Sequence, residues 1–233
     1  SKGMYRLHWN RLRIEMGVLK EIIYIGMPSA LQQSITAFSN VFVQSYINAF
    51  GSSVMAGWSS YIKIDQFVVI PANSISMSIT TFVGQNLGAF KAYRASKGTK
   101  ISVGIAAAAT AAVVAVLVAF APQAIMLFNR ETAVVECGTM LLRVMTPFYI
   151  VWSVNMILSG SLCGAGDTRM ATLIKLFSFV IYRQIYLFAV SRLFPNVLFA
   201  VAIGYPIGWT LSAVLITVYY IRKNKEITAR FSQ

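Results

Sequence analysis

Acidic residues are scarce in this sequence of 233 residues, which has 7 Asp and Glu against 20 Lys and Arg and a net charge of +13. Charged residues make up 12% of the chain and hydrophobic residues 57%, whereas a soluble domain has about 25% charged residues. A soluble protein with this excess of positive charge would suggest nucleic-acid binding. Here, however, the charges form short clusters between long apolar segments, which is typical of a polytopic membrane protein without a nucleic-acid partner.

Sequence motifs of catalysis are also missing. The chain contains no Walker loop, no H-E-x-x-H and no G-x-S-x-G, so we expect no enzyme, no catalytic residue, no bound metal and no cofactor. The segment CGAGDT (163–168) holds a lone G-x-G that follows a membrane helix. We expect it to form a tight turn, with Asp167 or Thr168 capping the next helix. Cys137 and Cys163 are predicted to lie roughly 39 Å apart along one helix, too far to form a disulfide.

The long apolar runs predict an all-α membrane protein, a bundle of six transmembrane helices. Each run contains the roughly 20 residues needed to cross a bilayer. Pro71 lies in the middle of the second span, and Pro147 is expected to kink the fourth. The six predicted spans are residues 19–50, 54–87, 101–121, 137–162, 170–193 and 197–221.

Lys and Arg are distributed unequally between the two ends of these spans. Fourteen lie on the side that holds both termini and two lie on the other side, which predicts cytoplasmic termini in a multi-pass protein of a bacterial-type plasma (inner) membrane. We divide the chain into a basic cytoplasmic linker (1–18), the transmembrane bundle (19–221) and a basic cytoplasmic tail (222–233).

Ionisable residues inside the spans are candidates for function, because each costs on the order of 3 kcal/mol at the centre of a membrane helix. Lys175 and Arg143 lie near span ends, from which they can reach the headgroups. Lys63, Asp65 and Arg183 are deeper. Lys63 and Asp65 point away from each other on their helix, so we expect Asp65 to pair with Arg183 first and with Arg143 second.

Polar uncharged residues concentrate in the first span, where Gln33, Thr36, Asn40 and Gln44 recur at intervals of three or four. This spacing places them in one stripe along the helix. Such a stripe either bonds neighbouring helices or lines an aqueous cavity for a solute. We assign these four residues, together with Asp65, Lys63, Arg183, Tyr149 and Asn155, as candidates for solute transport or ion coupling.

The sequence resembles the second half of transporters of the multidrug and toxic compound extrusion (MATE) family. The segments that carry the resemblance follow in the same order and are residues 25–51, 63–89, 142–168 and 183–187 (RQIYL). That resemblance implies one six-helix half of a twelve-helix transporter built from two bundles. It further implies an antiporter that exports small organic, often cationic, solutes in exchange for Na⁺ or H⁺ by alternating access. The partners implied are the N-terminal six-helix half and membrane lipids.

The sequence departs from the family in its carboxylates. In several branches the ion site is built from carboxylates on the first and fourth helices of this half. Here no carboxylate occurs between Glu21 and the outer loop, or between Glu136 and Asp167. Asp65 is then the only carboxylate that we place deep in a span, and the sequence leaves open whether the coupling ion is Na⁺ or H⁺. Two alternatives also stay open: a flippase for a lipid-linked or polysaccharide precursor, and a membrane scaffold without transport.

Overall fold

The computed structural model describes residues 15–194 and 197–230, and within these residues every element is a helix. Most of the predicted linker and residues 231–233 of the predicted tail lie outside the described residues. A 3₁₀ turn, η2 (Thr146–Phe148), and a π-helical segment, η3 (Phe177–Tyr182), interrupt two of the long helices. The α-helices are α1 (Met16–Asn48), α2 (Ser52–Gly88), α3 (Ala92–Ala119), α4 (Ala121–Met126), α5 (Thr132–Met145), α6 (Tyr149–Gly164), α7 (Thr168–Leu176), α8 (Arg183–Leu193), α9 (Leu198–Ala202) and α10 (Gly204–Arg230).

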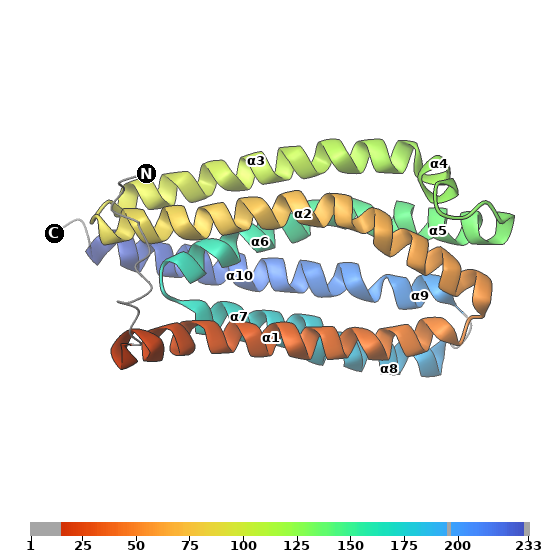
Figure 1. Cartoon of the computed structure of the whole chain (residues 1–233), viewed down its shortest axis with the longest axis horizontal. Helices are drawn as coiled ribbons and strands as arrows, with labels where there is room; N and C mark the ends of the chain where they lie inside the picture. Colours follow the sequence, from red (N-terminus) through yellow and green to blue (C-terminus); the bar gives the residue numbers. More distant parts are fainter. Residues whose placement is uncertain (1–14, 195–196, 231–233) are drawn as a thin grey trace, which may run out of the picture.

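The predicted bundle of six crossings is confirmed (Figure 1). The helices α1, α2 and α3 each make one crossing. The fourth crossing is α5–η2–α6, the fifth α7–η3–α8 and the sixth α9–α10. Five of the six crossings, all except α1, are long and apolar enough to span a membrane. The first helix begins and the last helix ends at the same end of the bundle (Figure 1).

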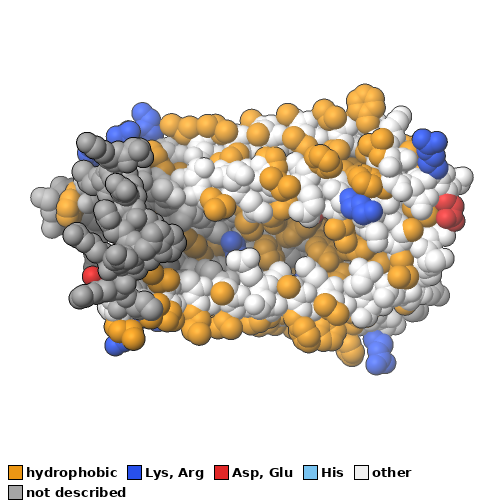
Figure 2. Space-filling model, viewed as in Figure 1, with side chains coloured by type: hydrophobic (Ala, Val, Ile, Leu, Met, Phe, Trp, Pro, Cys, Tyr) orange, Lys and Arg blue, Asp and Glu red, His pale blue; other side chains and the backbone are white. Residues whose placement is uncertain are grey.

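The crossings fall into two groups with α10 between them. Helix α2 packs on α3, α5 and α6, while α1 packs mainly on α7, and α10 contacts both α6 and η3. Hydrophobic side chains cover the outer flanks of both groups, and a hollow runs between them on the face shown in Figure 2. This division places polar side chains of α1 opposite those of α2.

Small residues allow α2 and α6 to approach closely. A Cβ atom added at Gly160 would lie 2.7 Å from the Ser76 carbonyl oxygen, and one at Gly164 would overlap the Thr80 carbonyl oxygen. Two hydroxyls bond across the same contact: Ser76 donates to the Met156 carbonyl (2.9 Å) and Thr80 to the Gly160 carbonyl (2.9 Å). This packing holds α2, and with it Asp65, in a fixed register against α6.

The interruptions of the long helices agree only in part with those that the sequence predicts. At Pro147, where a kink was predicted, the fourth crossing changes from α-helix to a 3₁₀ turn, because proline donates no backbone hydrogen bond. Helix α2 runs without interruption through Pro71. The π segment in the fifth crossing was not predicted, and α3 begins at Ala92, nine residues before the predicted start of the third span.

The turn between α6 and α7 forms as predicted, with Gly166 at φ +84°, a left-handed conformation that glycine adopts without strain. Asp167 occupies the N-cap position of α7, but its carboxylate does not bond that helix. It instead accepts a hydrogen bond from the Tyr219 hydroxyl of α10. The predicted side-chain cap by Asp167 is therefore wrong, because the carboxylate joins the turn to the last helix.

Candidate functional site

Two adjoining cavities form the hollow between the helix groups, and they share Asn40 of α1 and Tyr205 and Trp209 of α10. The first cavity encloses about 240 Å³ and contains Asp65, so we call it the acidic cavity. The second encloses about 530 Å³ and contains Lys175 and Arg183, so we call it the basic cavity. A basic side chain is visible inside the hollow in Figure 2. Together these cavities hold most of the deep ionisable and amide side chains.

Aromatic rings line the acidic cavity. The Tyr61 and Tyr149 hydroxyls lie 3.0 Å apart in a hydrogen bond between α2 and α6. Trp209 packs on Tyr149 with ring centroids 4.8 Å apart, and Trp58 packs on Tyr205 at 5.7 Å. These contacts fix flat apolar walls, against which an aromatic or cationic solute can pack.

Asp65 is the one carboxylate among the described residues that line the two cavities. It lies one helical turn from Tyr61. Its buried Oδ1 atom finds no hydrogen-bond partner within the described part of the chain. A buried carboxylate oxygen without a partner costs free energy, so Asp65 is the side chain in this hollow best suited to bind a proton or a cation.

Arg183 lies in the basic cavity and is 5% exposed. Its Nη2 atom donates to Ser39 Oγ (2.8 Å) and to Asn40 Oδ1 (2.9 Å) on α1, and its guanidinium lies 4.8 Å from the centre of the Tyr205 ring. Gln184 donates to the same Ser39 hydroxyl (2.6 Å). These bonds dock α1 on α8 and orient the guanidinium.

The predicted ion pair of Asp65 is wrong. Across residues 15–194 and 197–230 no Lys or Arg nitrogen lies within 4.0 Å of the Asp65 carboxylate. Arg183 turns toward α1, whose hydroxyl and amide oxygens accept its hydrogen bonds. Arg143 lies in a separate, mostly apolar groove beside Glu136. Asp65 and Arg183, the predicted pair, therefore lie in different cavities.

Lys63 also lies away from the predicted place. Its side chain is exposed, and its Nζ is 5.3 Å from the centre of the Phe128 ring, beyond the end of α4. A lysine stem can cover apolar surface in this way while its ammonium stays in a wet environment. Its expected place in the central cavity is corrected accordingly.

The polar stripe of α1 divides between the cavities. Gln33, Thr36 and Asn40 line the basic cavity, while Gln44, with Asn40, lines the acidic one. Gln44 also donates to Asn48 Oδ1 (2.8 Å) one turn further along α1. All four residues of the stripe therefore line a cavity. Asn40 also bonds a neighbouring helix, as in the alternative interpretation.

Tyr149 and Asn155, both on α6, meet different surroundings. Tyr149 lines the acidic cavity. Asn155 has no exposed surface and donates to Ser212 Oγ of α10 (2.6 Å) in the helix interface. Asn155 lines neither cavity, because its side chain is buried between α6 and α10.

Several cavity residues escaped the sequence analysis. Lys175 was expected to reach the headgroups but lines the basic cavity, with Asn73 and Ser76 of α2 opposite. The aromatic residues Trp152, Tyr205 and Trp209 contribute its walls. The sequence held one indication of this place for Lys175. Lys175 and Arg183 are eight residues apart, and in a helix with more than about 3.6 residues per turn that spacing puts both side chains on one face.

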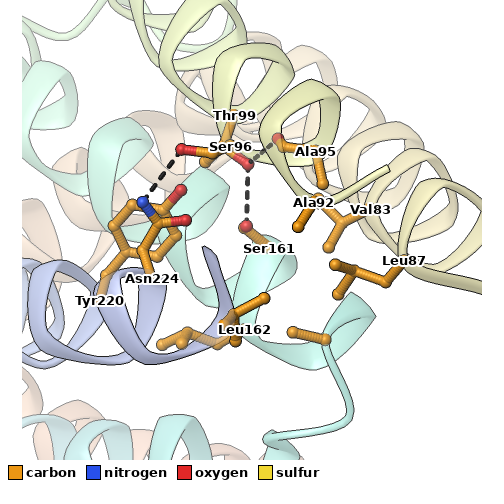
Figure 3. A pocket seen from close by; sticks show the side chains of 12 residues that line it. Val83, Leu87, Ala92, Ala95, Ser96, Thr99, Ser161, Leu162, Tyr220 and Asn224 are labelled. Atoms are coloured by element: carbon orange, nitrogen blue, oxygen red, sulfur yellow. Dashed lines mark hydrogen bonds between the residues drawn. The ribbon is translucent and has the colours of Figure 1, made fainter. Parts of the chain in front are cut away.

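A third pocket, drawn in Figure 3, is lined by Asn224 and Ile227 and so lies near the end of the bundle where α1 begins and α10 ends (Figure 1). Two hydrogen bonds cross it: Thr99 with Ser161 (2.9 Å) and Asn224 to Ser96 (3.0 Å). Its enclosed volume of about 20 Å³ is room for roughly one water. This pocket is a structural junction of α3, α6 and α10 and is too small for a solute.

A metal centre is not evident in residues 15–194 and 197–230, where no three His, Cys, Asp or Glu side chains gather. Cys137 and Cys163 are both free. The groups that the two cavities present are one carboxylate, two cations, amides, hydroxyls and aromatic rings.

Comparison with curated proteins finds relatives that are longer than this chain. It is 22% identical over 219 residues to the probable multidrug resistance protein YoeA of Bacillus subtilis, an alignment that covers 93% of this chain and 47% of YoeA. It is 27% identical over 201 residues to the probable multidrug resistance protein YpnP of the same organism, covering 85% of this chain and 44% of YpnP. The chain thus spans about half the length of these relatives.

Solved structures share the fold over the same fraction. An outward-facing multidrug resistance MATE family transporter of the MOP superfamily matches with a TM-score of 0.85 and 19% identity, covering 96% of this chain and 50% of that one. A MOP superfamily transporter from Pyrococcus furiosus matches with a TM-score of 0.86 and 21% identity, covering 95% and 50%. The family model MatE matches residues 27–186, well over half of the sequence. The chain therefore belongs to the MatE family.

Proposed function

We propose that this chain is the C-terminal six-helix half of a secondary active antiporter, which exports small organic solutes in exchange for Na⁺ or H⁺ by alternating access. The observation that carries the proposal is a hollow lined by ionisable, amide and aromatic side chains along one face of a bundle that spans half of its relatives. An N-terminal bundle placed over this face would close the hollow into a central binding site.

The proposed setting is a bacterial-type inner membrane with both termini in the cytoplasm. The supporting observation is the concentration of Lys and Arg at the end of the bundle where α1 begins and α10 ends, since basic loops stay on the cytoplasmic side. Solutes would then enter the hollow from the cytoplasm or the inner leaflet and leave on the opposite side.

Asp65 is the group that we assign to ion coupling. Its buried Oδ1 has no partner in the described residues, and amide and hydroxyl groups of Gln44, Gln66 and Tyr61 line the same cavity. A carboxylate in this setting gains most from binding a proton or Na⁺ in one state of the transport cycle. Exchange follows if solute and ion bind the hollow in alternation.

The experiment uses a bacterial host that lacks its own drug efflux pumps. Cells that express the full-length protein should accumulate less ethidium than cells with an empty vector. Cells that express residues 1–233 alone should accumulate as much as the empty vector, because one bundle supplies one wall of the site. Robust efflux by the 233 residues alone would contradict the half-transporter assignment and favour a homodimer.

The coupling ion is tested in proteoliposomes that contain the full-length protein. Dye movement is followed under an inward Na⁺ gradient at equal pH, and then under a pH gradient without Na⁺. Dependence on one gradient identifies the ion. Movement that ignores both gradients would contradict secondary active exchange.

One observation favours a second function, a flippase for a lipid-linked or polysaccharide precursor. The larger cavity holds the two cations Lys175 and Arg183, and none of the described residues that line it is acidic. A phosphate-bearing precursor would complement these charges. Accumulation of lipid-linked intermediates in a deletion strain, with no change in dye efflux, would support this candidate over the antiporter.

A further inference from the structure

The basic cavity carries two cations without a counter-charge among the described residues. Lys175 and Arg183 line it together, and the described residues that surround them are amides, hydroxyls, Met and aromatic rings. The only ion pair within the described part of the chain is Lys223–Glu226, near the end of α10. Unpaired cations inside a membrane are costly and mark binding sites by default, so an anionic ligand would stabilise both.

Arg183 is oriented for such a ligand. Its Nη2 is fixed by Ser39 and Asn40, while its buried Nε has no partner among the described residues. Contact with the Tyr205 ring holds the guanidinium plane. Guanidinium groups bind carboxylates and phosphates through two parallel hydrogen bonds. A side chain held by neutral acceptors on one edge keeps its full positive charge for an anion in the cavity.

The π segment brings Lys175 to the same face. Eight residues make about 2.2 turns of an α-helix, which would rotate Lys175 well away from Arg183. The six residues of η3 lie between them and have more residues per turn. The wider turns of η3 reduce the rotation between the two cations to nearly two whole turns, so both side chains lie on one face and line the same cavity. Segments of π-helix occur frequently at functional sites for this kind of reason.

Helix α10 accommodates the wider turn at one glycine. A Cβ atom added at Gly208 would lie 3.1 Å from the Ser178 carbonyl oxygen of η3. The Ser178 side chain itself is buried. This close packing on α10 helps to keep the π segment, and the alignment of its two flanking cations, in place.

From these observations we infer that Lys175, Arg183 and the amides Gln33, Asn40 and Asn73, together the basic subsite, bind the anionic group of an amphipathic solute. The group is a carboxylate, phosphate or sulfonate, and the apolar part of the solute packs on Trp152, Trp209 and Phe179. A simple organic cation would meet two like charges here, which disfavours it. The inference rests on the proposed transport function and adds a site for anionic solutes, while a cation such as ethidium would occupy the acidic cavity with Asp65 instead.

The test is a binding measurement on the full-length protein in phosphatidylcholine nanodiscs. The probes are two dansyl compounds of equal length, one ending in a carboxylate and one in a trimethylammonium group. Energy transfer from tryptophan, with Trp152 and Trp209 in the cavity wall, reports binding. We expect the anionic probe to bind about tenfold or more tightly than the cationic one, as for a charge-assisted hydrogen bond gained or lost.

Substitutions then locate the bound anion. Lys175→Gln and Arg183→Gln should each weaken the anionic probe about tenfold, and Arg183→Lys should restore part of the loss, because it keeps the charge without the planar fork. The matched controls are Lys63→Gln and Arg143→Gln, which remove basic side chains that lie outside both cavities. If Arg183→Gln fails to fold, Lys175→Gln and Arg183→Lys still decide the question.

Two results would overturn the inference. One is equal or tighter binding of the cationic probe by the Asp65→Asn protein, in which the acidic cavity has lost its carboxylate. The other is an anionic affinity that Lys175→Gln and Arg183→Lys leave unchanged. Either result leaves the efflux assay untouched, so failure of the inference is distinguishable from failure of the transport function.

The source of the anion is decided in the same nanodiscs. Phosphatidylglycerol added to the phosphatidylcholine should displace the dansyl anion if the natural ligand is a lipid headgroup. Displacement by a soluble aromatic carboxylate such as 2-naphthoate, with no effect of phosphatidylglycerol, identifies a soluble amphipathic anion. Both results support an anion subsite and differ only in the solute.

Discussion

Arg183 donates a 2.8 Å hydrogen bond to Ser39, joining α8 to α1 across 144 residues of sequence. Helix α1 packs mainly on α7 and exposes much of its surface, so this contact is one of its few buried polar attachments. The same side chains line the hollow or lie beside it. Arg183 thus both docks the first helix and supplies one of the two positive charges of the basic cavity.

Replacement of Ser39 by Ala should loosen this attachment. The substitution removes the acceptor of Arg183 and Gln184 inside the bundle, which typically costs about 1–3 kcal/mol of unfolding free energy. Thermal unfolding in detergent measures the change. Ser45→Ala is the control, because Ser45 donates to the Val41 carbonyl of its own exposed helix face. Equal losses in the two variants would contradict the role of Ser39.

Replacement of Asp65 by Asn should abolish ion-coupled efflux and leave the fold intact. Removing one partner of a buried ion pair typically costs about 3–5 kcal/mol, but Asp65 makes no such pair among the described residues. The unfolding free energy should therefore change by much less, while ethidium efflux by the full-length protein is lost.

Lys63→Gln serves as the control on the same helix, two residues away and outside the cavities, and should keep its efflux. An Asp65→Asn protein with full efflux would show that the carboxylate is not the coupling group. A large loss of stability would instead indicate a partner supplied by another part of the transporter.

The close contact of α2 and α6 predicts that a larger residue at Gly160 destabilises the bundle. Gly160→Ala would place a methyl group 2.7 Å from the Ser76 carbonyl, and overpacking of this kind typically costs about 1–3 kcal/mol. Gly104→Ala on α3 meets open space among the described residues and should be neutral or stabilising, since alanine favours helix over glycine. Comparable melting temperatures for the two variants would contradict the close packing.

How far the sequence could predict the structure depends on the length scale. Runs of about 20 apolar residues identify the crossings, because bilayer thickness sets that length. The surroundings of Asp65, Lys63 and Arg183 depend on which helix faces meet, and this is decided by contacts such as Gly164 with Thr80. One sequence by itself carries little record of those contacts.

The error on Lys175 has a local cause. Position along the span places Lys175 within reach of the membrane surface but does not say which face of the helix it occupies. The π segment Phe177–Tyr182 alters the rotation between Lys175 and Arg183, and no composition rule predicts it. Gly208, whose small size admits that segment, is recognisable only once α10 is placed beside it.

Two adjacent tyrosines of α10 should respond in opposite ways to loss of their hydroxyls. Tyr219 bonds the Asp167 carboxylate, whereas the buried Tyr220 hydroxyl has no partner within residues 15–194 and 197–230. Tyr219→Phe should cost about 1.5–3 kcal/mol, the usual range for a bond to a charged group, and Tyr220→Phe should be neutral or stabilising. Thermal unfolding of both variants decides this, and the reverse order would refute the assignment of the bond.

The orientation of the bundle is tested by labelling single cysteines in intact cells. Lys97 of α3 and Arg130, after α4, are both exposed and lie at opposite ends of the bundle. The order of the spans in the sequence assigns fourteen Lys and Arg to the side of Lys97 and two to the side of Arg130, so the positive-inside rule predicts that Lys97 is cytoplasmic. In a full-length protein with Cys137 and Cys163 replaced by Ser, Arg130→Cys should react with a membrane-impermeant maleimide from outside. Lys97→Cys should react only after the cells are opened, because the bilayer separates it from the reagent. Labelling of Lys97→Cys in intact cells, with Arg130→Cys protected, would reverse the bundle and with it the direction in which its hollow loads and releases solute.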